Sequence, residues 1–457
     1  MFERILDQKL QNIGKGLIHT DTAKIRASQI NHVTGEMIKK DLRQYVRASQ
    51  QLVGSRIISL YWLLAKTRGI REVASYKKGR PLQMKVYVGI DAHTTNYTFA
   101  AVYALDRDPI NVSSYQPCVK SVTDYCKGVK KKLGEDTEIV LGYEAGTLGF
   151  SLRRHLEKNG LSCIVMAPST ISGTEMNRKR RKKTDKRDAV AIAKSLMTHQ
   201  YSEVHMPDED DEAVRDYIRM REDLKHHQKS NKQQIGAFCH RHGFHFDDGK
   251  YWTKKHLEWL RSLPVSGTLK ETLDAYLRTY DYLIDRLKEV DMKIEAIAET
   301  DKYRESVHKL ICFKGIRTLT ALALIVEIGD FTRFVKAKNF AAFLGLVSGE
   351  DSSSTDQNLL GITKQGNRFL RKLLTEASQC FSRAISRKSK DLLRRQSGNT
   401  EQVIAYADKA NERLRKRYYH LVIHNKKHAN KANIAVAREL ACFVWGMMTG
   451  NIHPALA

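Results

Sequence analysis

Hydrophobic residues between positions 84 and 167 occur in short runs separated by polar turns, which is the pattern of buried strands. The runs are Met84–Asp91, Thr98–Tyr103, Glu138–Glu144 and Cys163–Ala167, and a helical stretch, Leu148–Lys158, lies between the last two. Strands that alternate with helices in this way predict an α/β domain.

Beyond this region the pattern predicts helices. One helix begins near Asp185, and a long helix covers about 208–241. A second long helix carries apolar residues at alternating steps of four and three, which is a heptad seam. The seam residues are Leu269, Leu273, Tyr276, Tyr280, Leu283, Leu287, Val290, Ile294 and Ile297. Such a seam joins two domains, pairs subunits or packs only within its own chain, and the sequence leaves these alternatives open.

These changes of pattern predict a fold class of α/β plus α, in four segments. Residues 1–83 are a basic, mostly helical extension, and residues 84–205 are the α/β domain. Residues 206–300 are a helical coiled-coil connector, and residues 301–457 are a mainly helical C-terminal domain.

The net charge of the chain indicates more about its partners than the overall composition does. The 457 residues include 78 Lys and Arg against 51 Asp and Glu, a net charge of +27, which favours a polyanionic partner such as nucleic acid over an acidic membrane surface. No apolar run is long enough for a membrane span, and the N-terminus lacks the apolar core of a secretory signal. The seven cysteines include no CxxC pair, which argues against a zinc site or a disulfide framework and favours the cytoplasm.

Four carboxylates stand out by position. Asp91 and Glu144 each end a predicted strand, and Asp185 and Asp188 share one face at the start of a helix. Acids at strand ends lie where ligands of α/β sheets bind, and together the four predict a site for Mg²⁺ that activates a phosphodiester. The alternative is that Asp185 is the N-cap of its helix or interacts with the helix dipole, and that Asp188 pairs with basic neighbours.

A serine-rich loop, Ser352-Ser353-Ser354, precedes a glycine-punctuated basic turn that enters a helix. A serine hydroxyl attacks phosphodiesters and holds the strand as a covalent ester, while Lys364, Arg368 and Arg371 are placed to offset phosphate charge. By composition alone, a solvated loop is the simpler interpretation.

Other basic residues are candidates for nucleic-acid contact. Lys314 lies in a segment, 311–321, that resembles a helix-hairpin-helix turn, although Gly315 also fits an ordinary helix stop. The basic run 413–417 lies on a late helix. Both this run and the basic loop before Asp185 are consistent with nucleic-acid contact and also with a solvated charged face. The candidates around that loop are Arg178, Lys179, Arg180, Arg181, Lys182, Lys183, Lys186 and Arg187.

Several motifs together resemble one family. They are Val86-Tyr87-Val88-Gly89-Ile90-Asp91-Ala92-His93, Tyr143-Glu144-Ala145-Gly146, Val165-Met166-Ala167-Pro168-Ser169, Lys183-Thr184-Asp185-Lys186-Arg187-Asp188-Ala189 and Gly361-Ile362-Thr363-Lys364-Gln365-Gly366-Asn367. In order and spacing, from Met84 to about Met448, they resemble the transposases of insertion-sequence family 110, which are related to Piv-type DNA invertases. The segment 208–216 is similar to the 1111 subgroup.

The resemblance implies a RuvC-like domain of the RNase H fold, with Asp91, Glu144, Asp185 and Asp188 as catalytic, metal-binding acids, and a second domain with a catalytic serine. It implies recombination of donor and target double-stranded DNA by a homo-oligomer, a tetramer or a dimer, guided by a structured bridge RNA. A prokaryotic, nucleoid-associated location in the cytoplasm follows from the same resemblance.

Two departures from the family pattern affect these expectations. The family places a glycine after its catalytic serine and a proline soon after the preceding Gly-Leu pair, where this chain has Ser354 and Val347-Ser348. Alignment from Gly345 and Gly361 indicates Ser353 as the nucleophile, with Ser352 and Ser354 as alternatives. The family usually begins near Met84, so residues 1–83 are expected to be an added segment or the product of an upstream start codon.

Two other functions use parts of the same pattern. A hydrolytic RuvC-like nuclease, such as a junction resolvase, needs the four acids but no serine, and it forms no covalent protein–DNA bond. A non-catalytic nucleic-acid scaffold tolerates the loss of Asp91.

Overall fold

The computed structural model describes residues 84–105, 108–171, 184–350, 358–383 and 387–452. Residues 84–457 belong to one compact unit. The predicted extension, residues 1–83, lies outside the described residues.

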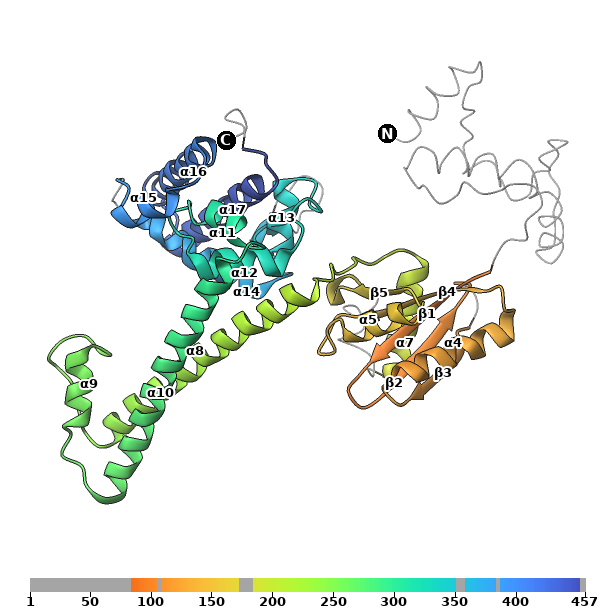
Figure 1. Cartoon of the computed structure of the whole chain (residues 1–457), viewed down its shortest axis with the longest axis horizontal. Coiled ribbons are helices and arrows are strands. Elements are labelled where there is room, and N and C mark those ends of the chain that lie inside the picture. Colours follow the sequence, from red (N-terminus) through yellow and green to blue (C-terminus); the bar gives the residue numbers. More distant parts are fainter. Residues whose placement is uncertain (1–83, 106–107, 172–183, 351–357, 384–386, 453–457) are drawn as a thin grey trace, which may run out of the picture. The chain divides into compact units, whose positions relative to one another are not determined.

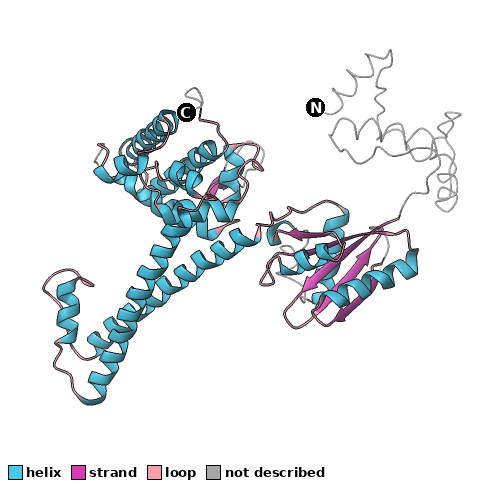
Figure 2. Ribbon diagram, viewed as in Figure 1, coloured by secondary structure: helices cyan, strands magenta, loops and turns pink. Residues whose placement is uncertain are grey.

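A five-stranded mixed sheet forms the first part of this unit, with the strand order β3-β2-β1-β4-β5 (Figures 1 and 2). β1 pairs in parallel with β4, which pairs in parallel with β5, whereas β2 is antiparallel to both β1 and β3. The strands are β1 Lys85–Ala92, β2 Tyr97–Val102, β3 Ile110–Tyr115, β4 Glu138–Glu144 and β5 Cys163–Met166.

Helices cover both faces of the sheet. α4 (Val119–Leu133) and α5 (Ser151–Lys158) enclose the larger apolar cluster on one face, built on Val86, Val88 and Ile90 of β1. α7 (Asp185–Met197) lies against β1, β2 and β4, with Ile192 and Leu196 buried beside Met166. β1 therefore reads as a nearly continuous apolar run, as expected for a strand covered on both sides.

The four predicted strands and the helix beginning at Asp185 are confirmed. The helix predicted from Leu148 begins instead at Ser151, after the turn at Gly149. β3 was not predicted, because its sequence INVSSY is partly exposed at the sheet edge and lacks an apolar run. The mixed α/β fold is consistent with an RNase H-like domain.

Two long helices follow, α8 (Glu209–Arg241) and α10 (Gly267–Ala298), joined through α9 (Lys254–Arg261). They are antiparallel, since Arg221 early in α8 pairs with Asp291 late in α10, whereas Lys232 lies over Tyr280. The bounds of α8 confirm the long helix predicted over about 208–241.

The seam of α10 is buried within the chain, from Leu273 to Ile294, mainly against α8. Its first turns differ from the predicted register: Leu269 is exposed, and Leu277 is buried more deeply than Tyr276. An α-helix with 3.6 residues per turn drifts from a strict heptad, which accounts for this shift. The coiled-coil description itself remains a prediction.

The C-terminal part is mainly helical and surrounds α12, which is buried along most of its length from Ala321 to Ile328. A two-stranded hairpin, β6 (Ser348–Glu350) and β7 (Leu359–Ile362), was not predicted. The helices of this part are α11 Arg304–Leu310, α12 Thr318–Ile328, α13 Ala337–Phe343, α14 Arg368–Ser378, α15 Lys390–Gln396, α16 Glu401–Tyr419 and α17 Ala429–Met448, with the short helices η3 Gln379–Ser382 and η4 His420–His424. The short helix η2 (Pro168–Thr170) follows β5 in the first part.

Candidate active site

The carboxyl ends of β1 and β4 carry two of the predicted acids. The parallel register pairs Ile90 with Tyr143, so Asp91 and Glu144 occupy the next position on neighbouring strands. Because Ile90 and Tyr143 point into the buried α4–α5 face, the next residue on each strand points to the opposite face, where α7 lies. The Asp91 side chain is 15% exposed, which leaves it accessible at the sheet edge.

α7 brings a third acid to this edge. Thr184 occupies the N-cap position and Asp185 is the first helical residue, so the alternative that Asp185 is the N-cap is wrong. The Asn96 side chain, in the turn between β1 and β2, donates a hydrogen bond of 3.5 Å to Asp185 Oδ2. The positive end of the helix dipole further stabilises a carboxylate at this point.

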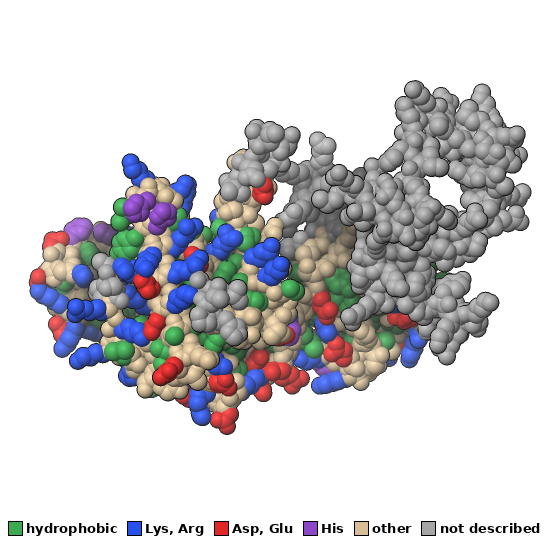
Figure 3. Space-filling view, turned by 90° about the horizontal axis from the view of Figure 1, so that it is seen from above, with side chains coloured by type: hydrophobic (Ala, Val, Ile, Leu, Met, Phe, Trp, Pro, Cys, Tyr) green, Lys and Arg blue, Asp and Glu red, His purple; other side chains and the backbone are tan. Residues whose placement is uncertain are grey.

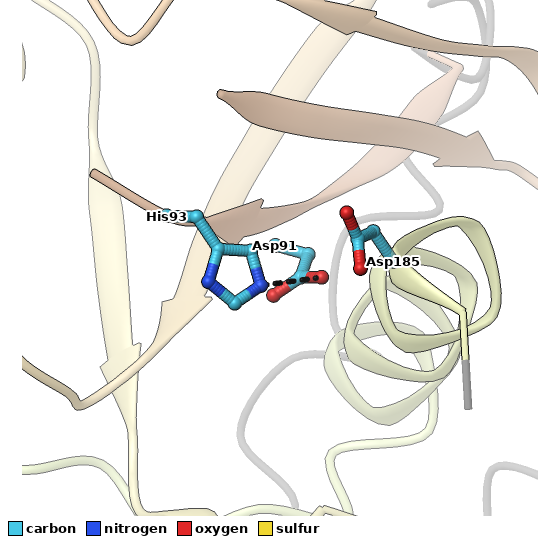
Figure 4. A group of neighbouring side chains, drawn as sticks. All are labelled: Asp91, His93 and Asp185. Carbon is cyan, nitrogen blue, oxygen red and sulfur yellow. Dashed lines mark ion pairs between the residues drawn. The ribbon is translucent and has the colours of Figure 1, made fainter. Parts of the chain in front are cut away.

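Asp91, His93 and Asp185 form a potential metal site. Their ligand atoms all lie within 4.8 Å of one another, and no other described group of three or more acidic, histidine or cysteine side chains has this geometry. Figure 4 shows the three side chains converging from the end of β1 and the start of α7, with His93 Nε2 3.4 Å from Asp91 Oδ2. Two carboxylates fit the preference of Mg²⁺ for oxygen, and the imidazole nitrogen also suits a transition metal such as Mn²⁺.

Glu144 and Asp188 are outside that three-residue group, although both lie on elements next to its members. Glu144 ends β4, the strand paired with β1, and Asp188 lies with Asp185 on the first turn of α7. Both are partly buried and both make interactions within the protein. Their role as metal ligands therefore remains a prediction.

His93 was not among the predicted ligands. It follows Asp91 by two residues, and this spacing places side chains on the same side of an extended chain. That spacing was the available signal, but β1 ends at Ala92 and the sequence does not show that the extended geometry continues.

The predicted serine loop lies in the sequence between β6 and β7, which pair as a hairpin. Ser348 pairs with Ile362 and Glu350 pairs with Leu359, so the two strands bracket residues 351–357. Ser352, Ser353 and Ser354 lie outside the described residues. The structure therefore describes the base of the loop, and the identity of the nucleophile remains a prediction.

The basic turn after β7 is held tightly against the end of α13. Gly366 has a φ of +83°, and a Cβ there would lie 1.9 Å from the carbonyl oxygen of Phe343, so only glycine fits. Arg371 Nη1 donates to the carbonyls of Leu344 (2.7 Å) and Gln365 (3.3 Å). Burial, and the charge of Arg368, lower the pKa of Arg371.

Arg371 thus binds the turn on which Lys364 is exposed, just before Arg368, the exposed first residue of α14. Both of these hydrogen bonds use Nη1 of Arg371, and a guanidinium has five N–H donors. The contact of Arg371 with phosphate therefore remains a prediction.

Asn367 connects the same turn to a buried carboxylate that sequence reasoning missed. Its side chain caps α14 by accepting from Leu370 N, and it donates to Glu327 Oε2 at 2.8 Å. Glu327, on α12, is 3% exposed and also receives Arg219 Nε (3.0 Å), while Arg215 Nε lies 3.7 Å away. The signal was one acid inside the apolar run of α12, but its partners are distant in sequence.

The predicted nucleic-acid-binding residues are only partly described. Arg178, Lys179, Arg180, Arg181, Lys182 and Lys183 lie outside the described residues. Lys186 and Arg187 are exposed on the first turn of α7, between the two aspartates. Figure 3 shows Lys and Arg side chains over much of the visible face of the described residues, with Asp and Glu side chains among them.

The segment resembling a helix-hairpin-helix turn does connect two helices, α11 and α12. Its Lys314 N–H donates to Asn411 Oδ1 at 2.9 Å, so this donor is already used within the protein. Arg395 Nη1 donates to the carbonyl of Ile316 at 2.7 Å. Phosphate binding by the Lys314 side chain remains a prediction.

Comparison with known proteins agrees with this arrangement. Residues 88–241 match a family model described as a DEDD transposase, and residues 307–394 match one described as "Transposase IS116/IS110/IS902 family". The chain is 33% identical over 355 residues to a transposase for insertion sequence element IS1533 from Leptospira borgpetersenii, an alignment that covers 76% of this chain and 99% of the relative.

The chain belongs to the IS116/IS110/IS902 family of transposases. It is also 24% identical to the transposase for element IS1328 of Yersinia enterocolitica, over 65% of this chain and 80% of the relative. The IS1111A transposase of Coxiella burnetii is 22% identical, over 58% of this chain and 67% of the relative. The predicted family is therefore confirmed, and its homologues include the IS1111A transposase.

Membership identifies an insertion-sequence transposase that recombines DNA, and a DEDD domain implies use of a divalent metal, typically Mg²⁺. The Asp91, His93 and Asp185 group fits such an ion. Among the described residues, no helix is both long and apolar enough to cross a membrane.

Proposed function

We propose that this transposase cuts and rejoins DNA by transferring a strand to Ser353, with Asp91, Glu144, Asp185 and Asp188 holding Mg²⁺. The observation that carries the proposal is the convergence of Asp91, His93 and Asp185, in a chain whose serine-rich segment lies in the sequence between the paired strands β6 and β7. A hydrolytic nuclease accounts for the first feature only.

Serine transfer preserves the energy of the phosphodiester. The Ser353 oxygen bonds to phosphorus, the bond from phosphorus to one deoxyribose oxygen breaks, and the proton of the hydroxyl ends on that leaving oxygen. Attack by the deoxyribose hydroxyl of another strand reverses these changes and frees the serine. No external energy source is needed for rejoining.

The acidic and the basic side chains of this chain have separate roles in the proposed reaction. Asp91 and Asp185, with His93 beside them and with Glu144 and Asp188 as the further proposed ligands, would hold the divalent ion, which would supply Lewis-acid polarisation of the phosphodiester. Lys364, exposed on the turn after β7, and Arg368, exposed at the start of α14, bind phosphate oxygens and offset negative charge. The contacts of Gly366 and Arg371 fix that turn, so the two cations are held in place.

The proposal includes a structured bridge RNA as guide and a homo-oligomer, a tetramer or a dimer, that holds donor and target DNA. These two elements rest on the family resemblance, and the net charge of +27 supports binding of several nucleic-acid strands. A nucleoid-associated location follows from the same binding.

A covalent adduct tests the proposal. Purified protein is incubated with Mg²⁺, its candidate RNA, and donor and target DNA, and protein–DNA adducts are resolved on a denaturing gel. We expect an adduct in the wild type and in Ser352→Ala, and none in Ser353→Ala. An adduct that survives in Ser353→Ala moves the nucleophile to Ser352 or Ser354.

Metal-dependent cleavage without an adduct in any variant would instead establish the hydrolytic nuclease, such as a junction resolvase. Retention of full recombination by Asp91→Asn would contradict the metal-site assignment and favour a scaffold role.

A further inference from the structure

A large cavity lies beside the β6–β7 hairpin, in the C-terminal part of the protein. It has a volume of about 930 Å³ and is formed by α16, α17 and the two strands β6 and β7. Ser348 of β6 and Ile362 of β7, a paired position at the base of the hairpin, form part of its wall. The size is within the roughly 300–1,000 Å³ of typical ligand pockets.

Aromatic side chains line part of the cavity. Tyr406 donates a hydrogen bond of 3.3 Å to the carbonyl of Phe443, and Trp445 Nε1 donates to the carbonyl of Phe334 at 3.0 Å. These bonds satisfy the polar atoms of both rings and leave their carbon surfaces to line the cavity. Most of the exposed lining is apolar, which suits the face of a planar ring.

The rim of the same cavity is basic. Arg413 and Arg417 of α16, and Lys431 and Arg438 of α17, line it together with one acid, Glu439. Glu439 pairs with Arg413 and lies 4.0 Å from Arg417, so it offsets part of the charge and leaves a net positive rim. A smaller hollow with Lys416 and His420 adjoins the rim and extends its basic character along α16.

An apolar interior inside a cationic rim has the chemistry of a nucleotide site, because a base is a flat apolar ring joined to an anionic phosphate. A regular duplex keeps its bases stacked and presents only phosphate to such a surface. The cavity therefore favours a strand with an unpaired base over a regular duplex.

We infer that this cavity binds an unpaired deoxynucleotide of the DNA strand, with its base among Tyr406, Phe443 and Trp445 and its phosphates at Arg413 and Arg438. The cavity adjoins the base of the β6–β7 hairpin, so the purpose of the binding would be to hold the DNA strand near the two β-strands that flank the serine segment in the sequence. That purpose rests on the proposed function, whereas the binding itself does not.

Single-strand binding tests the inference. The probes are one fluorescein-labelled oligodeoxynucleotide, its duplex and the single-stranded RNA of the same sequence, each titrated by fluorescence anisotropy without Mg²⁺ so that no chemistry occurs. Ala435→Phe puts a ring into the cavity, since Ala435 lines it, and Arg438→Gln removes one rim charge. The matched control, Arg415→Gln on α16, removes a charge at a position outside the cavity lining.

We expect Ala435→Phe to weaken single-strand DNA binding by about tenfold, the order of one base–aromatic stack, with duplex binding unchanged. Arg438→Gln should weaken single-strand binding more than Arg415→Gln does. Thermal unfolding of each variant shows that the fold is kept, and Arg438→Gln provides the test if Ala435→Phe fails to fold.

Three results would overturn the inference: unchanged single-strand binding in both cavity variants, an equal loss for duplex and single strand, or tighter cavity-dependent binding of the RNA. These results are separable from the serine proposal. Loss of the adduct in Ser353→Ala with normal single-strand binding supports both, whereas cavity-dependent binding with no adduct in any variant sustains the cavity and refutes the serine step.

Discussion

Gly89 of β1 and Ala189 of α7 lie so close that a methyl group at position 89 would be 2.1 Å from the Ala189 carbonyl oxygen. The same methyl group would be 2.5 Å from the backbone nitrogen of Ala193. Gly89 is two residues before Asp91, and Ala189 is four residues after Asp185. The contact therefore fixes the distance between the two acids of the candidate metal site.

Gly89→Ala should displace α7 from the sheet and separate Asp91 from Asp185. Neither overlapping atom is on a flexible side chain, so the helix itself has to move. We expect a destabilisation of about 1–3 kcal/mol, which is typical of an overpacked core, and a larger proportional loss of strand cleavage. Thermal unfolding and a cleavage assay on the same preparation measure the two effects.

Gly128→Ala is the matched control for this substitution. Gly128 lies within α4, and a Cβ there has no neighbour within 4 Å. Alanine is favoured over glycine in a helix interior by roughly 0.5–1 kcal/mol, so this variant should be slightly more stable and fully active. Equal behaviour of the two variants would show that the Gly89 contact does not position α7.

Removing one ligand side chain from the candidate metal site should weaken metal binding itself, which is measured in the absence of strand cleavage. Asp91→Asn and Asp185→Asn each replace an anionic ligand by a neutral one, and His93→Gln removes the imidazole. We expect at least a tenfold weaker affinity for Mn²⁺, the order seen even for outer-shell changes, as measured by electron paramagnetic resonance of the free ion. Asp124→Asn, exposed on α4, should bind like the wild type. Unchanged affinity in Asp91→Asn would rule out this ion site.

Patterns within a single element were enough to predict much of the fold. β1 and β4 are apolar runs that end in acids, so both the strands and the candidate residues Asp91 and Glu144 followed from the sequence. The start of α7 was also predictable, because two acids and a basic loop precede an apolar helical face. β3 escaped prediction because an exposed edge strand needs no apolar run.

Contacts between distant segments could not be predicted in the same way. Glu327 pairs with both Arg219 and Asn367, which are more than a hundred and forty residues apart in the sequence. No local sequence pattern encodes these contacts. His93 lies just beyond the end of β1, and no pattern in the sequence places its side chain beside the acids. The cavity beside the hairpin likewise depends on how α16 and α17 meet β6 and β7.

The carboxylate of Glu327 should be essential for stability. It is almost completely buried and offsets the charge of Arg215, whose pKa is lowered by burial despite the attraction of Glu327. Glu327→Ala leaves that charge without its counterion, and breaking a buried pair in this way costs about 3–5 kcal/mol. Chemical denaturation measures the loss.

Glu412→Ala is the control for Glu327, since its pair with Lys416 is exposed on α16 and should contribute nothing measurable. A loss of stability equal in the two variants would contradict a structural role specific to Glu327. Retention of wild-type stability by Glu327→Ala would show that Arg215 is solvated in the folded protein.

His256, on α9, should make the protein less stable in mild acid. It is 2% exposed, and its Nδ1 accepts a hydrogen bond of 3.2 Å from Trp252 N, which requires a neutral ring at that atom. The rings of Phe246, Tyr251 and Trp259 surround it, and burial lowers its pKa below the usual value of about 6.5.

Because the unfolded chain binds the proton more readily, the stability due to neutral His256 is complete above about pH 6.5 and is lost as the pH falls toward the lowered pKa of the folded state. His256→Asn keeps an acceptor for Trp252 N without a titrating ring, so its unfolding midpoint should fall less than that of the wild type between about pH 7.5 and about pH 5.5. His245→Asn, at an exposed position, should follow the wild type. If all three proteins lose stability equally over this interval, other groups are responsible and His256 is not buried in its neutral form.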